Sequence, residues 1–211
     1  QVLSNYLADF AKEMGATCPI IVVPNGVDIK HFSQETKVFP LKKEKGEIFL
    51  ITTSRLVKKN AVGDIIKSLT HLAPNIKLLI LGIGPLEQEL RVLTKSLNLE
   101  SRVNFVGFVP NRELPAYLHQ SDIFIRPSLS EGFGVSFVEA MAAGLPVITT
   151  PVGGIVDFLV EGKTGLFCEV NNPKSIADQV ELLINDEKLY RRIIINAYTM
   201  VKEKYTWDIV A

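Results

Sequence analysis

The strongest constraint on the fold of this chain is a regular alternation of short β-branched runs with segments of helical spacing. The runs that predict buried strands lie at residues 20–23, 48–53, 76–81, 103–106, 123–125, 147–150 and 166–168. Helical spacing occurs between most of them, at residues 62–72, 86–97, 112–119, 135–143 and 155–160, and then at 176–184 and 188–202. This cadence is typical of right-handed crossovers between parallel strands. The sequence therefore predicts an α/β fold, a doubly wound, Rossmann-like parallel sheet with helices on both faces.

Composition excludes several other classes of protein. The 211 residues carry 23 basic and 23 acidic side chains, so the formal net charge is zero and no nucleic-acid partner is indicated. A hydrophobic share of 47% with 22% charged residues is typical of a folded domain rather than a disordered chain. No apolar run approaches the roughly 18 residues of a membrane span. Cys18 and Cys168 lie far apart, which fits a reducing compartment, so we expect a cytoplasmic protein.

The ends of the chain indicate a piece of a longer protein. Residue 1 is Gln, and Ser4 can cap a helix that begins at once and ends at Gly15. The segment 37–45, which contains one proline and four lysines, resembles a linker. We therefore expect a leading fragment and linker from a preceding lobe over residues 1–45. A Rossmann-like domain with a C-terminal helical tail is expected over 46–211.

Ligands of doubly wound sheets bind at the carboxyl ends of the strands, so the loops that follow strands are the places to search for a site. Gly82-Ile83-Gly84 follows one strand and precedes a helix, as a dinucleotide-binding loop would. However, Glu87 replaces the third glycine of that fingerprint. These residues therefore favour a tight turn followed by Pro85 at a helix start.

The next glycine-rich loop is a stronger candidate. Gly132 and Gly134 remove side chains where a backbone must approach a ligand, and the helix that begins at Val135 presents free amide groups to an anion. Glu131 lies in the loop and Glu139 in the helix, and carboxylates accept hydrogen bonds from the vicinal hydroxyls of sugars. The pattern therefore indicates a phosphate site in which one carboxylate holds a hexose and the other a ribose.

Two hydrolase mechanisms that use these residue types fit less well. The nucleophile elbow of serine hydrolases needs a glycine two residues after the serine, and Val138 stands there after Ser136. Glycosidases hold two carboxylates about 5 to 9.5 Å apart, whereas eight helical residues span about 12 Å. Metal chemistry is not indicated either, because the three histidines lack partners at ligand spacing.

Cations follow the first strand of the predicted domain, at Arg55, Lys58 and Lys59. A diphosphate beside Glu131 suffers a repulsion of about 1 to 4 kcal/mol per charge pair at 4 Å, which a cation must offset. The guanidinium fork of Arg55 suits phosphate oxygens, and one of the two lysines can add a second positive charge. Alone these residues describe an exposed basic loop. Beside the glycine-glutamate loop they indicate a diphosphate site.

Together these motifs resemble a known enzyme family. In chain order they are Pro24-Asn25-Gly26-Val27-Asp28, Ser54-Arg55-Leu56-Val57, Glu131-Gly132-Phe133-Gly134 with Glu139-Ala140-Met141, Gly144-Leu145-Pro146-Val147 and Gly153-Gly154. The order resembles the C-terminal, donor-binding lobe of retaining glycosyltransferases of the two-lobed GT-B architecture, in glycosyltransferase family 4 (group 1). The resemblance covers nearly the whole chain.

The resemblance implies a catalytic set of Glu131, Arg55 and Lys59, in which the two cations hold the diphosphate of a nucleotide sugar. The family usually has its phosphate lysine five residues after the arginine, followed by glycine. Here those two positions are occupied by Asn60 and Ala61, and Lys59 stands one position earlier.

The resemblance also implies which residues contact the donor, mostly through their backbone. These are Gly132, Phe133, Gly134 and Val135 for the sugar, and Phe108 and Val109 for the base. Glu139 would bind the ribose hydroxyls. Asp157 stands where a glutamate is usual after the double glycine.

The expected function is transfer of a sugar, with its anomeric configuration kept, from a UDP- or GDP-sugar to an acceptor hydroxyl in polysaccharide or glycolipid synthesis. The missing N-terminal lobe would supply the acceptor site, so this fragment alone should bind nucleotide without turnover. No cofactor is implied, because the nucleotide sugar is a substrate, and the reaction is expected to be independent of metal. Peripheral contact of the full-length protein with the inner face of a membrane is left open. So are a nucleotide-sugar epimerase or hydrolase of the same fold and an inactive interaction lobe.

Overall fold

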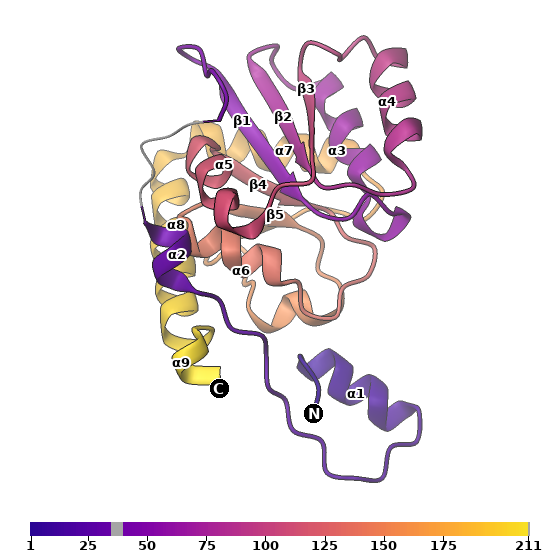
Figure 1. Ribbon diagram of the computed structural model, residues 1–211, viewed down its shortest axis with the longest axis vertical. Helices are drawn as coiled ribbons and strands as arrows, with labels where there is room; N and C mark the ends of the chain where they lie inside the picture. The colour runs from indigo at the N-terminus through magenta and orange to yellow at the C-terminus, as the bar shows by residue number, and fades with distance from the viewer. Residues whose placement is uncertain (35–39, 211) are drawn as a thin grey trace.

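The computed structural model describes residues 1–34 and 40–210. Within them, a six-stranded parallel sheet with the order β3-β2-β1-β4-β5-β6 forms the centre of the molecule (Figure 1). The strands are β1 (Ile48–Thr53), β2 (Ile76–Leu81), β3 (Val103–Gly107), β4 (Ile123–Arg126), β5 (Val147–Thr149) and β6 (Leu166–Phe167). The order confirms the predicted doubly wound α/β fold, because the chain runs outward from β1 to β3 and then continues on the other side of β1 with β4.

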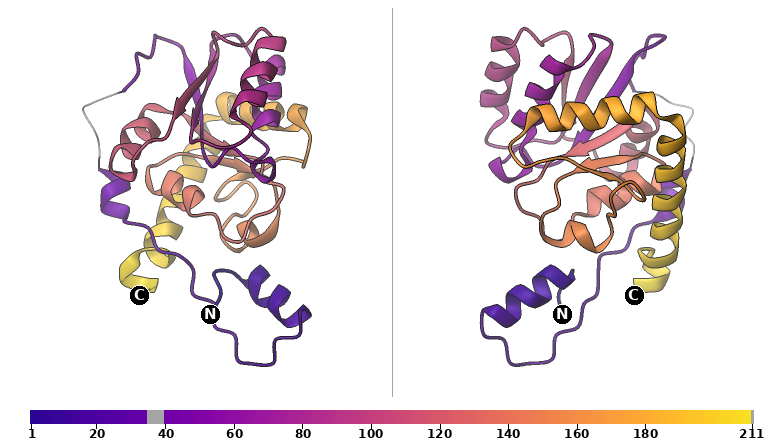
Figure 2. Two further views of the ribbon diagram at one scale, coloured as in Figure 1. Left: turned by 45° about the vertical axis from the view of Figure 1, so that its right-hand side comes forward. Right: turned by 180° about the vertical axis from the view of Figure 1, so that it is seen from behind.

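Helices cover both faces of this sheet (Figures 1 and 2). They are α1 (Asn5–Glu13), α2 (Ile29–Ser33), α3 (Val62–Ser68), α4 (Glu87–Ser96), α5 (Leu114–Gln120), α6 (Val135–Ala142), α7 (Pro173–Asn185), α8 (Glu187–Lys204) and α9 (Trp207–Val210). The 3-10 helices are η1 (Lys58–Asn60), η2 (Leu69–His71), η3 (Asn111–Glu113) and η4 (Gly153–Asp157). Helices α3, α4 and α7 pack on one face, α5 and α6 pack on the other, and α8 contributes to both. Over the described residues, none of these helices is both long and apolar enough to cross a bilayer.

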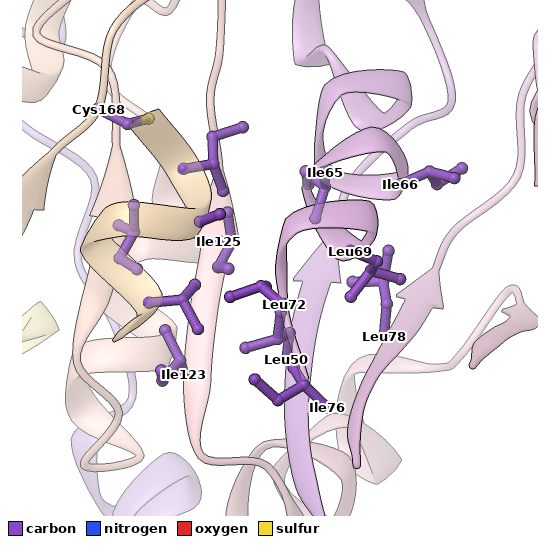
Figure 3. Close-up of a cluster of buried hydrophobic side chains, with 14 of the residues drawn as sticks. Leu50, Ile65, Ile66, Leu69, Leu72, Ile76, Leu78, Ile123, Ile125 and Cys168 are labelled. Carbon is purple, nitrogen blue, oxygen red and sulfur yellow. The ribbon is translucent and has the colours of Figure 1, made fainter. Parts of the chain in front are cut away.

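Two clusters of buried apolar side chains join these layers. Leu50 of β1 packs with Ile65 of α3 in the cluster drawn in Figure 3. Ile51, the next residue of β1, belongs to the cluster on the opposite face, since successive strand residues point to opposite sides. That second cluster includes Phe124 of β4 and Phe137 of α6, whose rings meet edge to face at 5.7 Å. The strands are therefore buried on both faces, which is why they form uninterrupted apolar runs.

One predicted strand is wrong. Residues 20–23 do not join the sheet, and their described pairing is an isolated bridge between Val22 and Val2. Ile21 is 65% exposed. A β-branched run forms a sheet strand only where neighbouring strands pair with it, and this run lies beside the start of the chain instead.

One predicted helix is also wrong, since residues 155–160 contain only the end of the short η4. Gly153 and Gly154 begin this segment in close contact with another loop, and the chain leaves helical geometry after Asp157. The other predicted elements are present, β1 and β2 with the predicted ends and the rest with ends that differ by a few residues. Residues 62–72 divide into α3 and η2, and residues 112–119 divide into η3 and α5.

The leading segment packs against the rest of the chain. Ser4 caps α1 as predicted, because its hydroxyl accepts a hydrogen bond from the backbone N–H of Leu7 at 3.2 Å. The backbone N–H of Asn5 donates to Asp157 Oδ2 at 2.7 Å, so η4 supports the start of α1. Farther along, Val27 forms a bridge with Thr206 before α9. The linker expected at 37–45 lies partly outside the described residues.

Candidate functional site

The direction of the sheet order reverses between β1 and β4. In sheets of this topology, ligands bind beyond the carboxyl ends of the strands at such a reversal. Arg55 and Lys59 follow β1, and Glu131 follows β4, so the fold brings the three predicted residues to the same edge. The two loops are also joined directly, because the N–H of Leu129 donates to the carbonyl of Lys59 at 2.7 Å.

Of the two candidate lysines, Lys59 is the one beside the predicted carboxylate. Its Nζ lies 3.8 Å from Glu131 Oε1, and its side chain is 53% exposed against 13% for Glu131. At 3.8 Å and with the ammonium half exposed, this ion pair contributes only about 0 to 1 kcal/mol to stability, so the ammonium can turn toward an anion. Lys58 lines a separate groove between α3 and α4, with Leu90 and Leu93.

Asn60 closes the loop that carries these cations. Its Nδ2 donates to the carbonyl of Arg55 at 2.7 Å, and the residue is buried. At the position where the family has a lysine, this chain thus has an amide that shapes the loop from inside. Arg55 itself is exposed at the same edge.

Glycines allow the loop after β2 to pack against the Arg55 loop. A Cβ on Gly82 would lie 1.9 Å from the carbonyl oxygen of Ser54, and one on Gly84 would lie 2.4 Å from that of Leu56. Leu56 also exchanges backbone hydrogen bonds with this loop. The geometry agrees with a structural turn here, which supports the loop after β1.

A second pair of glycines supports the glutamate loop in the same way. A Cβ on Gly153 would lie 1.9 Å from the carbonyl oxygen of Glu131, and one on Gly154 would lie 2.1 Å from that of Gly132. The N–H of Gly154 donates to the Glu131 carbonyl at 3.0 Å. The double glycine therefore sets the backbone position of Glu131.

The sequence reasoning missed Arg126, the last residue of β4, which is 6% exposed. Its Nη2 donates to Glu131 Oε2 at 2.5 Å, its Nη1 to Ser136 Oγ at 2.7 Å and its Nε to Ser128 Oγ at 3.2 Å. The guanidinium also lies 4.2 Å from the centroid of the Phe137 ring. The available signal was a charged residue that ends an otherwise apolar strand.

The charges around Arg126 compensate one another. Burial lowers the pKa of Arg126, and the negative charges of Glu131 and Glu139 oppose that shift. Both predicted carboxylates thus act on one guanidinium, although they are eight positions apart in sequence.

Glu139 lies on α6 in a mostly buried position. Burial raises the pKa of its carboxyl group, while a hydrogen bond from Asn111 and the charges of Arg126 and His31 lower it. Asn111 Nδ2 is 3.5 Å from Glu139 Oε1, and His31 Nε2 is 3.1 Å from the Asn111 carbonyl. The sequence did not single out Asn111, and it gave His31 no metal role because the three histidines lack partners at ligand spacing.

The remaining predicted contacts differ in what they can offer a ligand. The ring of Phe133 is 2% exposed and packs against Phe158 and Tyr205 at 5.5 and 5.6 Å, so only its backbone can meet a donor. Val135 and Val109 are partly buried against the same core cluster. Phe108 is 72% exposed. Within residues 1–34 and 40–210, no group of His, Cys, Asp or Glu side chains is arranged to hold a metal ion.

The fold and these residues define a doubly wound α/β domain with Arg55, Lys59 and Glu131 at the reversal of its sheet. Comparison with known proteins gives the family, because residues 33–200 match Glycosyl transferases group 1. The chain belongs to this family.

Relatives and solved structures agree with that assignment. Over 171 residues the chain is 37% identical to N-acetyl-alpha-D-glucosaminyl L-malate synthase of Bacillus anthracis, an overlap of 78% of this chain and 44% of that protein. The fold of the present chain is similar to that of Anabaena HepE, which was solved in complex with UDP and glucose. The TM-score is 0.86 at 23% identity, over 97% of this chain and 58% of the Anabaena chain.

The C-terminal domain of a glycosyl transferase group 1 family protein (LpcC) from Francisella tularensis gives a TM-score of 0.73 at 26% identity. That match covers 86% of this chain and 100% of the Francisella chain. The chain spans about half the length of the curated relatives it matches.

Proposed function

We propose that this chain is the donor-binding lobe of a retaining glycosyltransferase of family 4, with the two-lobed GT-B architecture. It would bind a UDP- or GDP-sugar, and the whole enzyme would transfer a hexosyl-type sugar to an acceptor hydroxyl. The observation that carries the proposal is the meeting of Lys59 with Glu131 at the reversal of the sheet, in a chain of the group 1 family. The UDP and glucose bound by Anabaena HepE, which has the same fold, support this class of ligand.

Positive charge at the carboxyl end of β1 would serve the leaving group. Arg55 and Lys59 would neutralise the diphosphate, and the amides at the start of α6, from Val135 onward, would add a preorganised positive end. These groups stabilise charge that grows on the departing diphosphate, so they favour the transition state over the bound substrate.

The carboxylates would hold the sugars of the donor. Glu131 and the backbone of Gly132, Phe133 and Gly134 would face the transferred sugar. Glu139 would accept hydrogen bonds from the ribose hydroxyls, and Phe108 with Val109 would line the base pocket. A mostly buried Glu139 suits this role, because a carboxylate shielded from water binds hydroxyl groups more strongly.

Acceptor recognition would belong to the part of the enzyme that this chain does not span. The 211-residue chain should therefore bind nucleotide without sustained transfer. Relatives named for capsular polysaccharide biosynthesis and for monoglucosyldiacylglycerol synthesis support acceptors of those classes. A cytoplasmic location with peripheral contact at a membrane is a further part of the proposal.

Calorimetric titration with UDP, GDP and UDP-glucose tests the proposal, with two adjacent lysines as matched variants. Lys59→Met should weaken binding of the preferred nucleotide about fivefold to tenfold, the loss of roughly 1 kcal/mol of attraction at 4 Å. Lys58→Met, on the other side of η1, should change it less than twofold. Equal effects of the two variants, or no binding of any of these nucleotides, would refute the proposed site. Sustained transfer by this chain alone would contradict the need for a second lobe.

A further inference from the structure

We infer that Arg126 is a positioning residue for Glu131. Arg126 would determine which carboxylate oxygen of Glu131 faces the donor, and in this way it would support recognition of the donor's sugar. The identity of the ligand in this inference rests on the proposed function. The positioning role itself rests on the hydrogen bonds of Arg126.

The first step concerns the charge of Arg126. A guanidinium that is 6% exposed has lost nearly all contact with water, which is unfavourable unless anionic and hydrogen-bonding partners replace the water. Glu131 provides the direct ion pair. Among residues 1–34 and 40–210, removing the guanidinium leaves the Glu131 carboxylate with the half-exposed Lys59 as its remaining ion-pair partner.

The second step concerns the span of its hydrogen bonds. Ser128 lies before the glycine-rich loop, Glu131 lies within it, and Ser136 lies in the first turn of α6. Arg126 donates to all three from the end of β4, a central strand of the sheet. One rigidly mounted side chain thus fixes both ends and the middle of the loop.

The third step concerns the two oxygens of Glu131. Oε2 is taken by Arg126, whereas Oε1 accepts the N–H of Gly132 at 3.1 Å and faces Lys59 at 3.8 Å. A sugar hydroxyl held by Glu131 would therefore meet Oε1, next to the cation proposed for the phosphate. Each nitrogen of Arg126 already donates a hydrogen bond and the residue is buried, so it acts through Glu131 rather than on the donor.

The experiment compares the affinities of this chain for UDP-glucose and for UDP, measured by calorimetry. Arg126→Met should weaken UDP-glucose binding about tenfold and UDP binding less than threefold, because the loss falls on the sugar contact. The double variant Arg126→Met/Glu131→Gln should be no weaker than Glu131→Gln alone, since the two residues act as a unit. Equal weakening of both ligands, or additive losses in the double variant, would overturn the inference.

A matched arginine separates positioning from general stability. Arg102 donates to the carbonyls of Leu69, Leu72, Ala73 and Ile76 at the opposite end of the strands. Arg102→Met should lower the free energy of unfolding while the ratio of the two affinities stays within twofold of the unsubstituted value. A comparable loss of sugar discrimination in this control would overturn the inference.

Hydrogen exchange provides a readout that needs no ligand. Amides of residues 131–135 should exchange at least tenfold faster in Arg126→Met than in the unsubstituted chain, and Arg102→Met should leave them unchanged. Failure of the unsubstituted chain to bind UDP, GDP and UDP-glucose would refute the proposed function alone. Unchanged exchange in Arg126→Met would refute the positioning role in either case.

Discussion

Gly153→Ala tests whether the double glycine positions the proposed catalytic carboxylate. Gly153 has a φ of +57°, and a Cβ built there lies 1.9 Å from the carbonyl oxygen of Glu131. Real Cβ contacts are essentially never shorter than 3.0 Å, so the two loops must separate by about 1.1 Å or more. That shift disrupts the bond from Gly154 N–H to the same carbonyl.

The size of the effect follows from two separate contributions. An alanine at a left-handed φ costs about 1 to 2 kcal/mol wherever it is placed. Overpacking adds about 1 to 3 kcal/mol, so the total loss of stability should be roughly 2 to 5 kcal/mol. A displacement near 1 Å of a positioned catalytic group also lowers the catalytic rate, here that of the whole enzyme, by on the order of 10²-fold.

Gly144→Ala is the matched control. Gly144 follows α6 and has a φ of +80°, and a Cβ added there would meet no atom within 4 Å, so it shares the backbone strain without the clash. Denaturant unfolding and titration with UDP-glucose should show a loss of about 1 to 2 kcal/mol and nearly unchanged affinity for this variant. If Gly153→Ala unfolds and binds as Gly144→Ala does, the close packing of the two loops has no role in the site.

Three further predictions concern other parts of the chain. Gly26→Ala should displace α9, because a Cβ at this position would lie 2.7 Å from the indole of Trp207. The fluorescence emission of Trp207, the single tryptophan, should therefore shift to the red, and an unshifted spectrum would contradict the displacement of α9. Glu139→Gln should raise the free energy of unfolding at pH 7. Burial raises the folded-state pKa of Glu139 above 4.5, so the folded chain loses stability as pH rises from 4.5 through that folded value. Denaturant unfolding should show the advantage at pH 7 and none below about pH 4, and equal stability at pH 7 contradicts it. Burial raises the pKa of Cys168 to about 12, so iodoacetamide at pH 8 should add one group per native chain, at the exposed Cys18; two groups by mass spectrometry refute this.

Most of the fold could be predicted because its signals are local and repeated. Strands such as Ile48–Thr53 are buried on both faces, and they are therefore recognisable as apolar runs without knowledge of their neighbours. The errors fall where a tertiary contact decides the outcome. Residues 20–23 have a strand composition but lie outside the sheet, and residues 155–160 follow glycines whose packing against another loop limits the helix.

The site was predictable to the extent that topology alone assembles it. Glu131 and Lys59 could be expected near each other, because both follow strands that end at one edge of a parallel sheet. Arg126 could not, because its partners Ser128 and Ser136 become a binding set only when the loop folds back over the end of β4. A sequence pattern shows that a charge ends a strand, but it does not show which groups surround it.

The backbone contacts of the site also explain how this chain accommodates Asn60 in place of the family's lysine. The loop after β1 is joined to the glutamate loop by Leu129 N–H and the carbonyl of Lys59, and the buried Asn60 side chain holds it from inside by donating to the carbonyl of Arg55. Ala61 adopts a φ of +48°, where glycine is usual, even though a left-handed alanine costs about 1 to 2 kcal/mol. The loop thus keeps its shape against the backbone preference of Ala61, because the Asn60 amide and the neighbouring glutamate loop hold that shape. With the backbone fixed in this way, a lysine one position earlier can still reach Glu131, and we propose that Lys59 supplies the cation of the site.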